Sequence, residues 1–425
     1  MEYTYPECEK YINDIPKFAG KNSLDDTYAV LKRMYKDEKR PIAHIAGTNG
    51  KGSVSAYLSS LLRECGYKVG IFTSPHLVSM RERIAVNESL ISEEDFVKCF
   101  NRVRIAVQDA KVSHPSFFEY LFLMAMSYFE EMDVDMIILE TGLGGRKDAT
   151  NCIKNKSVSV ITRIGYDHME YLGDTLPLIA GEKAGIIMEG VPVIYLDHDD
   201  QVSGVIEKRA EELNSKCYPI KTKDIKNAAL TQDGIDFSLF NDYYNLEGLC
   251  LNTKALYQTE NASLALMAFY VLKENFARED IIRRGLKKAF WKGRMEEISL
   301  NVFLDGAHNE DGIRAFLYSV KEISACKEKN ALLFSVVSDK EYEKMIGMIM
   351  DSDLFSKIYV TVLKGSRRTS LDELKGVFGS YENADMEFYD DSSKAYERAI
   401  SRREDDGYLF IAGSLYLVGE IEAIV

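Results

Sequence analysis

The stretch 42–53 holds residue types that could bind a phosphate group. An apolar run, which predicts a strand, ends in a loop where three glycines surround Lys51. Apolar residues then recur at helical spacing over 54–65, so a helix is expected to follow the loop. Backbone N–H groups of a glycine loop can turn toward one anion, and the helix N-terminus and the lysine add positive charge. The order of strand, loop and helix therefore predicts a phosphate site.

The loop departs from the standard P-loop spacing of Gly, four residues and Gly-Lys-Ser/Thr. Ile45 stands where the first glycine belongs, and Gly52 moves the hydroxyl group to Ser53. A glycine-rich turn without a ligand is the structural alternative. A lysine between two glycines at a strand–helix junction is hard to explain structurally, so the pattern favours the phosphate site.

Three further polar residues, Ser74, Glu140 and His168, follow predicted strands of their own. The alternation of strands and helices predicts a parallel sheet, in which ligands bind beyond the carboxyl ends of the strands. Glu140 could hold Mg²⁺ on nucleotide phosphates, although a capped structural carboxylate is the alternative. His168 alone could be a hydrogen-bonded structural histidine, and Ser74 a turn residue before Pro75. Their shared position beside the glycine loop favours a common site.

The later part of the chain repeats this alternation on a smaller scale. Residues 225–255 are expected to form a small hairpin around Asp233-Gly234, and the segment 74–92 to be irregular. A hinge is expected near 293–299, followed by a second set of strands. Asp305 and His308 at one strand end could close over a nucleotide, although an Asp-Gly turn is the alternative. The expected strands of this second set are 302–305, 331–337, 357–362, 386–389 and 408–412.

These patterns predict an α/β protein with a P-loop-containing, doubly wound, mostly parallel sheet and a second, smaller α/β domain. The expected domains are 1–293 and 294–425 of the 425 residues. A net charge of −14 argues against a nucleic-acid partner, and no apolar run is long enough to span a membrane. Scattered cysteines and an N-terminus without signal-peptide features favour a cytoplasmic protein with reduced thiols.

Several separated segments together resemble the folylpolyglutamate synthase/dihydrofolate synthase family of the Mur ligase superfamily. They lie between positions 47 and 416 and occur in family order. The segments are Gly47–Ser53, Thr73–Leu77, Phe117–Glu119, Glu140–Arg146 with Asp148–Asn151, Asp167-His168 with Glu182–Ile186, Asn261-Ala262, Asp305–Asn309 and Gly413–Tyr416.

The resemblance implies that ATP phosphorylates a carboxylate of a pterin substrate and that the amine of L-glutamate attacks the acyl phosphate. It implies folate or dihydropteroate as acceptor, two Mg²⁺ sites, a Lys183 similar to the family's carbamylated lysine, and a monomer. The implied catalytic residues are Lys51, Glu140, His168, Lys183 and His308. The implied ATP contacts are Gly47, Thr48, Asn49, Gly50, Lys51, Gly52, Ser53, Asn261, Arg294 and Asp305. The implied metal ligands are Ser74, Glu140, His168 and Lys183. The implied pterin contacts are Ser116, Phe117, Phe118, Glu119, Lys147, Asp148 and Ala149.

Three positions depart from the family pattern. Lys292 and Glu310 stand where prolines are common, and Lys147 replaces an apolar residue beside the pterin site. Two other functions stay open: a Mur-type ligase of another substrate, and a P-loop ATP-binding regulator without ligase activity. The 46 residues before Gly47 are expected to be too few for the extra N-terminal domain of the cell-wall Mur ligases. The pairing of Asp305 with His308 argues against the regulator.

Overall fold

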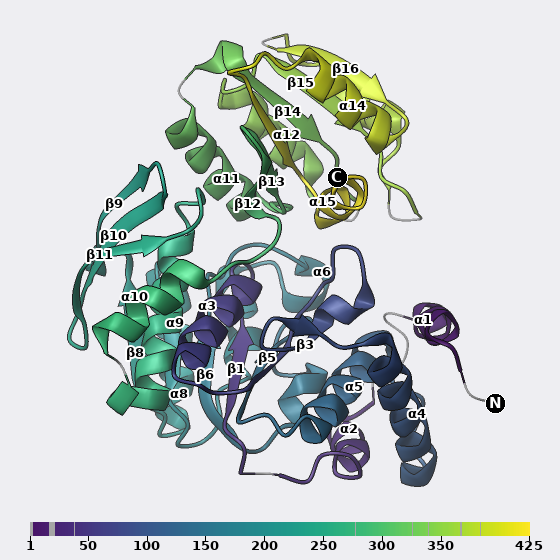
Figure 1. Cartoon of the computed structure of the whole chain (residues 1–425), viewed down its shortest axis with the longest axis vertical. Helices are drawn as coiled ribbons and strands as arrows, with labels where there is room; N and C mark the ends of the chain where they lie inside the picture. The colour runs from purple at the N-terminus through teal and green to yellow at the C-terminus, as the bar shows by residue number, and fades with distance from the viewer. Residues whose placement is uncertain are drawn as a thin grey trace.

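The protein folds into two lobes, each built around its own β-sheet (Figure 1). This computed structural model describes residues 3–16, 22–37, 39–276, 278–324, 326–338, 340–365, 368–382 and 384–425. We call the part built on the eight-stranded sheet the first lobe, and the part that begins at Arg294 the second lobe. The fold class predicted from the sequence is confirmed.

The sheet of the first lobe has the strand order β4-β3-β2-β5-β1-β6-β7-β8. Six of its strands are parallel, and β3 and β4 run antiparallel at one edge. The segment 74–92 was expected to be irregular, and that expectation is wrong: it contains a short 3₁₀ helix and the strands β3 and β4. The strands are β1 (Ile42–Ala46), β2 (Val69–Phe72), β3 (Ile84–Val86), β4 (Ser89–Leu90), β5 (Met136–Glu140), β6 (Lys156–Ile161), β7 (Val193–Asp197) and β8 (Cys217–Lys221).

Helices cover both faces of this sheet, which explains why β1 and β5 are apolar without alternation and buried along their whole length. One face carries α3 (Lys51–Glu64), α9 (Gln258–Lys273) and α10 (Glu279–Lys288). The opposite face carries α1 (Tyr5–Asp14), α2 (Leu24–Leu31), α4 (Glu93–Ala110), α5 (Phe117–Glu131), α7 (Leu176–Ala184) and α8 (Asp200–Glu212). No helix of the described residues is long and apolar enough to cross a membrane.

A small antiparallel sheet packs beside α9 in the first lobe. The predicted hairpin around Asp233-Gly234 is present, since Thr231 of β9 pairs with Gly234 of β10. A third strand, which the sequence pattern did not reveal, completes the sheet. Its strands are β9 (Ile225–Thr231), β10 (Gly234–Phe240) and β11 (Asn245–Leu251).

The second lobe has a six-stranded sheet with the order β12-β13-β17-β14-β15-β16. All five strands expected there are present. Residues 294–299, within the segment where the hinge is expected, form the edge strand β12, antiparallel to β13. The strands are β12 (Arg294–Ser299), β13 (Val302–Asp305), β14 (Asn330–Phe334), β15 (Lys357–Thr361), β16 (Asp385–Tyr389) and β17 (Tyr408–Ala412). The helices are α11 (Glu310–Ile323), α12 (Tyr342–Asp351) and α13 (Leu371–Phe378) on one face, with α14 (Ser392–Arg402) and α15 (Leu415–Glu422) on the other.

Candidate active site

A cavity of about 700 Å³ lies where loops from the carboxyl ends of both sheets meet. Its walls include the glycine loop after β1, the loops after β2 and β5, and the start of α5. The second lobe closes it with Arg294, His308 and the segment Ser414–Tyr416. One cavity thus joins the predicted phosphate site to the predicted pterin site.

The glycine loop runs from Gly47 to the first turn of α3. Gly50 has a left-handed φ of 91°, and a Cβ there would lie 2.2 Å from the Asn261 side chain, so only glycine fits. The Lys51 Nζ donates to the carbonyls of Gly47 and Thr48 at 3.1 and 3.2 Å, and it lies 4.0 Å from Glu140 Oε1. These contacts place a lysine ammonium inside the loop, beside a carboxylate.

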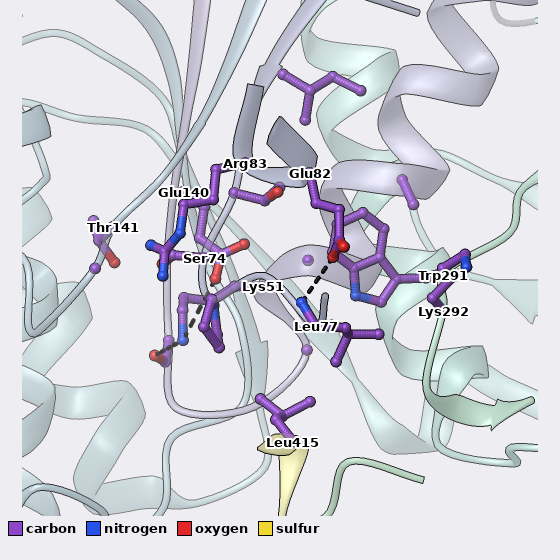
Figure 2. A pocket seen from close by; sticks show the side chains of 18 of the residues that line it. Lys51, Ser74, Leu77, Glu82, Arg83, Glu140, Thr141, Trp291, Lys292 and Leu415 are labelled. Carbon is purple, nitrogen blue, oxygen red and sulfur yellow. Dashed lines mark hydrogen bonds and ion pairs between the residues drawn. The ribbon is translucent and has the colours of Figure 1, made fainter. Parts of the chain in front are cut away.

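Glu140 ends β5 deep in the cavity wall, with only 2% of the residue exposed (Figure 2). Its Oε2 has no hydrogen-bond partner among the described residues. Burial raises the pKa of the Glu140 carboxyl to about 7, although Lys51 and the backbone N–H of Ser74 act in the opposite direction. A buried carboxylate oxygen without a donor is an unfavourable arrangement unless a cation or proton binds it. Glu140 is therefore suited to hold a cation.

His168 and Lys183 line the same cavity on the side of β6. Lys183 is 4% exposed, and its Nζ donates to the carbonyl of Gly47 at 2.7 Å. Burial, followed by repulsion from Lys51, lowers the pKa of Lys183 to about 7. Burial also lowers the pKa of His168 to about 4, so its imidazole is neutral at pH 7. A neutral imidazole can be a metal ligand, and an amine with a pKa near 7 is partly unprotonated and nucleophilic.

Asp305 ends β13 and is only 2% exposed, whereas His308 follows it and lines the cavity. Asp305 accepts hydrogen bonds from the Tyr257 hydroxyl at 2.6 Å and from the backbone N–H groups of Met295 and Ala307 at 3.0 and 2.8 Å. His308 Nδ1 lies 2.7 Å from the Gly306 carbonyl, which only accepts, so Nδ1 carries the proton and Nε2 has a free lone pair.

Three of the predicted ATP contacts, Ser53, Asn261 and Asp305, lie outside the lining of this cavity. Ser53 and Asn261 are buried in a hydrogen-bonded row behind the glycine loop: Asn261 donates to Gln258 Oε1, and Gln258 Nε2 donates to Ser53 Oγ. Gln258 lines a second cavity of about 500 Å³, which shares Trp291 and Arg294 with the first.

The predicted pterin contacts fall on two segments: Ser116, Phe117, Phe118 and Glu119 lie at the start of α5, and Lys147, Asp148 and Ala149 follow β5. Phe118 lies against Gly142 on the cavity wall, whereas Lys147 is exposed and outside the lining. Glu119 is only 3% exposed and accepts a hydrogen bond from the backbone N–H of Ser116 at 2.7 Å. Glu119 therefore caps α5 rather than facing a ligand with both carboxylate oxygens.

Asp148 holds the loop after β5 in place. Its Oδ2 accepts from the backbone N–H groups of Gly142 and Leu143 at 2.9 and 3.0 Å, and its Oδ1 from that of Thr150 at 3.1 Å. The buried His44 of β1 lies 2.7 Å from Thr150 Oγ1. These contacts fix the wall on which the pterin residues lie.

Comparison with known proteins agrees with this geometry. Residues 45–269 match the Mur ligase middle domain, and residues 293–415 match the glutamate ligase domain of Mur ligases. The dihydrofolate synthase/folylpolyglutamate synthase of Bacillus subtilis is 33% identical over 438 aligned positions, which cover 99% of both chains. The chain belongs to the folylpolyglutamate synthase/dihydrofolate synthase family of Mur ligases.

Solved structures of this family share the fold. Escherichia coli FolC in complex with DHPP and ADP is 25% identical with a TM-score of 0.85, over 99% of this chain and 97% of that chain. The folylpolyglutamate synthase of Thermotoga maritima is 32% identical with a TM-score of 0.82, over 99% and 96%. The Mycobacterium tuberculosis enzyme complexed with ADP and AMPPCP has a TM-score of 0.87 at 26% identity, over 99% and 98%.

Sequence reasoning missed three side chains of this ligase cleft. Arg83 lies buried near Glu140 and donates to His76 Nδ1 at 2.8 Å (Figure 2). Trp291 covers Gly52 at the start of α3. Lys340 reaches the cavity from the second lobe. Lys340 follows β14, so the strand-end argument that selected Glu140 could have found it, whereas Arg83 lies in a segment expected to be irregular.

Proposed function

We propose that this chain is an ATP-dependent ligase that adds L-glutamate to folates, and also to dihydropteroate, through an acyl-phosphate intermediate. The observation that carries the proposal is the single cavity that joins the Lys51 loop to the aromatic start of α5. A phosphate donor and a flat-ring acceptor can meet in such a space. In this proposal residues 1–293 bind ATP and the pterin, and residues 294–425 form the glutamate ligase domain.

The triphosphate of ATP would lie on the glycine loop, with its charge opposed by Lys51 and the loop N–H groups. Preorganised donors and cations of this kind stabilise the charge that develops as the acceptor carboxylate attacks the terminal phosphate. Arg294 and Asp305 would contact the nucleotide from the second lobe, and Asn261 from behind the loop. His308 would lie close to the reacting phosphate.

The residues around Glu140 fit Mg²⁺. The unpartnered Oε2 of Glu140 is a hard oxygen ligand, and Ser74 and His168 lie on the same cavity wall. Among the described residues, no group of three or more His, Cys, Asp and Glu side chains is arranged to hold a metal ion. The site therefore needs Ser74, phosphate oxygens or a modified lysine as further ligands. Bound Mg²⁺ would screen the charges of the phosphates and the acceptor.

Lys183 would complete a second metal site if its amine were carbamylated. An unmodified ammonium repels a cation, whereas a carbamate is an anionic oxygen ligand. Carbamylation requires the neutral amine, and the pKa of about 7 makes that form available at neutral pH. In this proposal Lys183 belongs to the metal set with Ser74, Glu140 and His168.

The pterin ring would occupy the part of the cavity beside α5. Phe117 and Phe118 offer aromatic surface, and Asp148 and Ala149 line the same cavity. The exposed Lys147 could meet only the outer part of the acceptor. We further propose that the enzyme acts as a monomer in the cytoplasm, which size-exclusion chromatography and fractionation would test.

The test is an assay of the purified chain with ATP, Mg²⁺ and L-glutamate, using dihydropteroate and tetrahydrofolate in parallel. We expect ADP formation that requires both glutamate and a pterin acceptor, with one glutamate joined per ADP. ADP formation without an acceptor would indicate a nucleotide hydrolase. Ligation of a different amino acid or acceptor would indicate another Mur-type ligase.

A further inference from the structure

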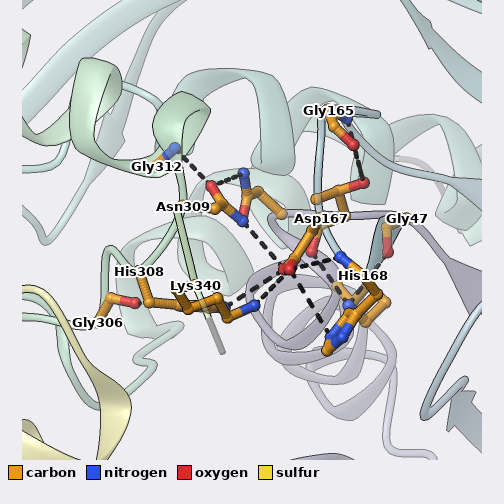
Figure 3. A network of polar contacts seen from close by, with 12 residues as sticks. Gly47, Gly165, Asp167, His168, Gly306, His308, Asn309, Gly312 and Lys340 are labelled. Atoms are coloured by element: carbon orange, nitrogen blue, oxygen red, sulfur yellow. Dashed lines mark hydrogen bonds and ion pairs between the residues drawn. The ribbon is translucent and has the colours of Figure 1, made fainter. Parts of the chain in front are cut away.

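A network of polar contacts joins the two lobes next to the glycine loop (Figure 3). Asn49 of the loop and Asn309 of the second lobe form a reciprocal amide pair, with N···O distances of 3.0 and 3.1 Å. Asn309 Nδ2 also donates to Asp167 Oδ2 at 3.3 Å. One side chain of the second lobe therefore contacts both the glycine loop and the loop after β6.

Asn309 is held rigidly while it makes these contacts. It is the N-cap of α11, and its Oδ1 accepts from the backbone N–H of Gly312 at 2.8 Å. The residue is 5% exposed. Because the cap fixes the side chain relative to α11, the amide pair forms only when α11 stands in one position against the glycine loop.

A buried ion pair accompanies the amide pair. Lys340 lies between β14 and α12 and binds Asp167, and both side chains are about nine-tenths buried. His168 and His308 lie 3.9 and 3.7 Å from the same carboxylate. This ion pair therefore joins the second lobe to the loop after β6.

We propose that Asn309 and Lys340 are positioning residues that clamp the second lobe onto the glycine loop and so hold His308 and Asp305 over the nucleotide. Asp305, His308 and Asn309 belong to one continuous segment at the end of β13, so the position of Asn309 sets that of the other two. The expected kinetic effects rest on the proposed function, whereas the expected effect on the lobe arrangement is independent of it.

The most informative variant is Asn309→Asp. Aspartate is as good an N-cap as asparagine, so α11 keeps its first hydrogen bond. The substitution removes the donor to Asn49 and Asp167 and places a second carboxylate beside Asp167. Asn309→Ser also keeps a cap but adds no charge. Lys340→Met removes the other contact, and Lys340→Arg is the conservative comparison.

Ser370→Ala is a matched control in the same lobe. Ser370 caps α13, and among the described residues its side chain bonds Glu373 of its own helix and no residue of the first lobe. Its loss should lower the melting temperature without changing the lobe arrangement. A variant that acts only through stability will behave like this control.

The measurements are small-angle scattering of the full chain, with and without AMPPCP and Mg²⁺, together with kcat and the KM for ATP. For Asn309→Asp and Lys340→Met we expect a larger radius of gyration, a lower kcat and a higher KM, with roughly 10- to 100-fold lower kcat/KM, because small displacements of reacting groups cost rate. Lys340→Arg should recover most of the activity.

The proposal is overturned if both variants keep the wild-type scattering curve, or if their defects match those of Ser370→Ala. Failure of the proposed function gives a different result: the wild-type chain would then show no glutamate-dependent ADP formation. In that case the scattering of the variants without nucleotide still decides whether the clamp holds the lobes together.

Discussion

The strand ends of the two lobes face the same cleft but are built differently. In the first lobe, Glu140 has an unpartnered buried oxygen, and Lys183 is buried with a lowered pKa. In the second lobe, Asp305 accepts three hydrogen bonds and His308 Nδ1 is bound to a carbonyl. The strand end of the first lobe holds charged groups that need a ligand, whereas Asp305 and His308 Nδ1 already have hydrogen-bond partners, one of which, Tyr257, belongs to the first lobe.

This difference indicates a division of work between the lobes. Unsatisfied buried charge costs folding stability and is typical of a site that binds ions. Side chains whose polar groups already have hydrogen-bond partners are rigid and are suited to be moved as a unit. The first lobe is therefore expected to bind phosphate and metal, and the second to position groups against them. Substitutions at the strand ends of the two lobes should therefore have different effects on activity and on stability.

The largest effect is expected from Lys51→Ala. The substitution removes the ammonium that the glycine loop itself carries, so ATP turnover should fall about 1,000-fold or more. The melting temperature should change little, because Lys51 bonds only loop carbonyls and lies 4.0 Å from Glu140. Steady-state ADP release and calorimetry measure both. Near-normal ligation would show that the loop is not the phosphate site.

Glu140→Gln should separate activity from stability. The folded pKa of Glu140 is about 7 and its ordinary value is 4.5, so ionisation opposes folding above pH 4.5 and the penalty is complete above pH 7. The amide should therefore stabilise the protein at pH 8, on the order of 1–3 kcal/mol, while activity falls about 100-fold. Denaturant unfolding at pH 8 measures the first effect. A destabilised variant would mean that the neighbours of Glu140 already compensate its carboxylate.

Lys183→Ala should lower activity about 100-fold through loss of the proposed carbamate ligand. Short carboxylates such as formate or acetate should then restore part of the activity, because they supply an anionic oxygen in the space left by the side chain. The assay is ADP release with increasing carboxylate concentration, with Lys51→Ala as the variant that should not respond. Full activity without rescue would remove the carbamate proposal.

Asp305→Asn should behave in the opposite way to Glu140→Gln. The amide NH₂ would face donors that the carboxylate now accepts from, which leaves buried groups unpaired and costs about 1–3 kcal/mol. Activity should fall about tenfold, through poorer positioning of the segment that carries His308. Thermal unfolding together with the KM for ATP measures both effects. An unchanged melting temperature would show that the three hydrogen bonds to Asp305 do not stabilise the fold.

The smallest effect is a pH dependence that His44 gives to the first lobe. Burial lowers the pKa of His44 well below 6.5, so the unfolded chain binds the proton more readily, and stability is lost as pH falls below about 6.5. The loss approaches about 1.4 kcal/mol per pH unit for one group. His44→Gln should flatten this dependence between pH 6.5 and 5, as followed by denaturant unfolding. An unchanged slope would show that other groups control acid unfolding.

The sequence could predict much of the fold because the parallel strands are buried on both faces and are therefore continuously apolar. β1, β5 and β13 begin and end within one or two residues of their predicted positions. The strands β3, β4 and β12 were missed because β3 and β4 have only three and two residues, and β12 is partly exposed along its length. The three-stranded sheet was only half predicted, since its third strand has no turn signal like that of Asp233-Gly234.

The residues of the candidate site likewise divide into those that the sequence could predict and those that only the tertiary structure revealed. The glycine loop, Glu140 and His168 could be identified from the sequence, because each follows a strand and parallel strands bring their carboxyl ends to one edge. The tertiary structure alone decided that Lys340 binds Asp167, that Arg83 lies buried near Glu140, and that Lys147 is outside the cavity. Contacts between lobes depend on the orientation of two separately folded sheets, and no local pattern of residues encodes that orientation.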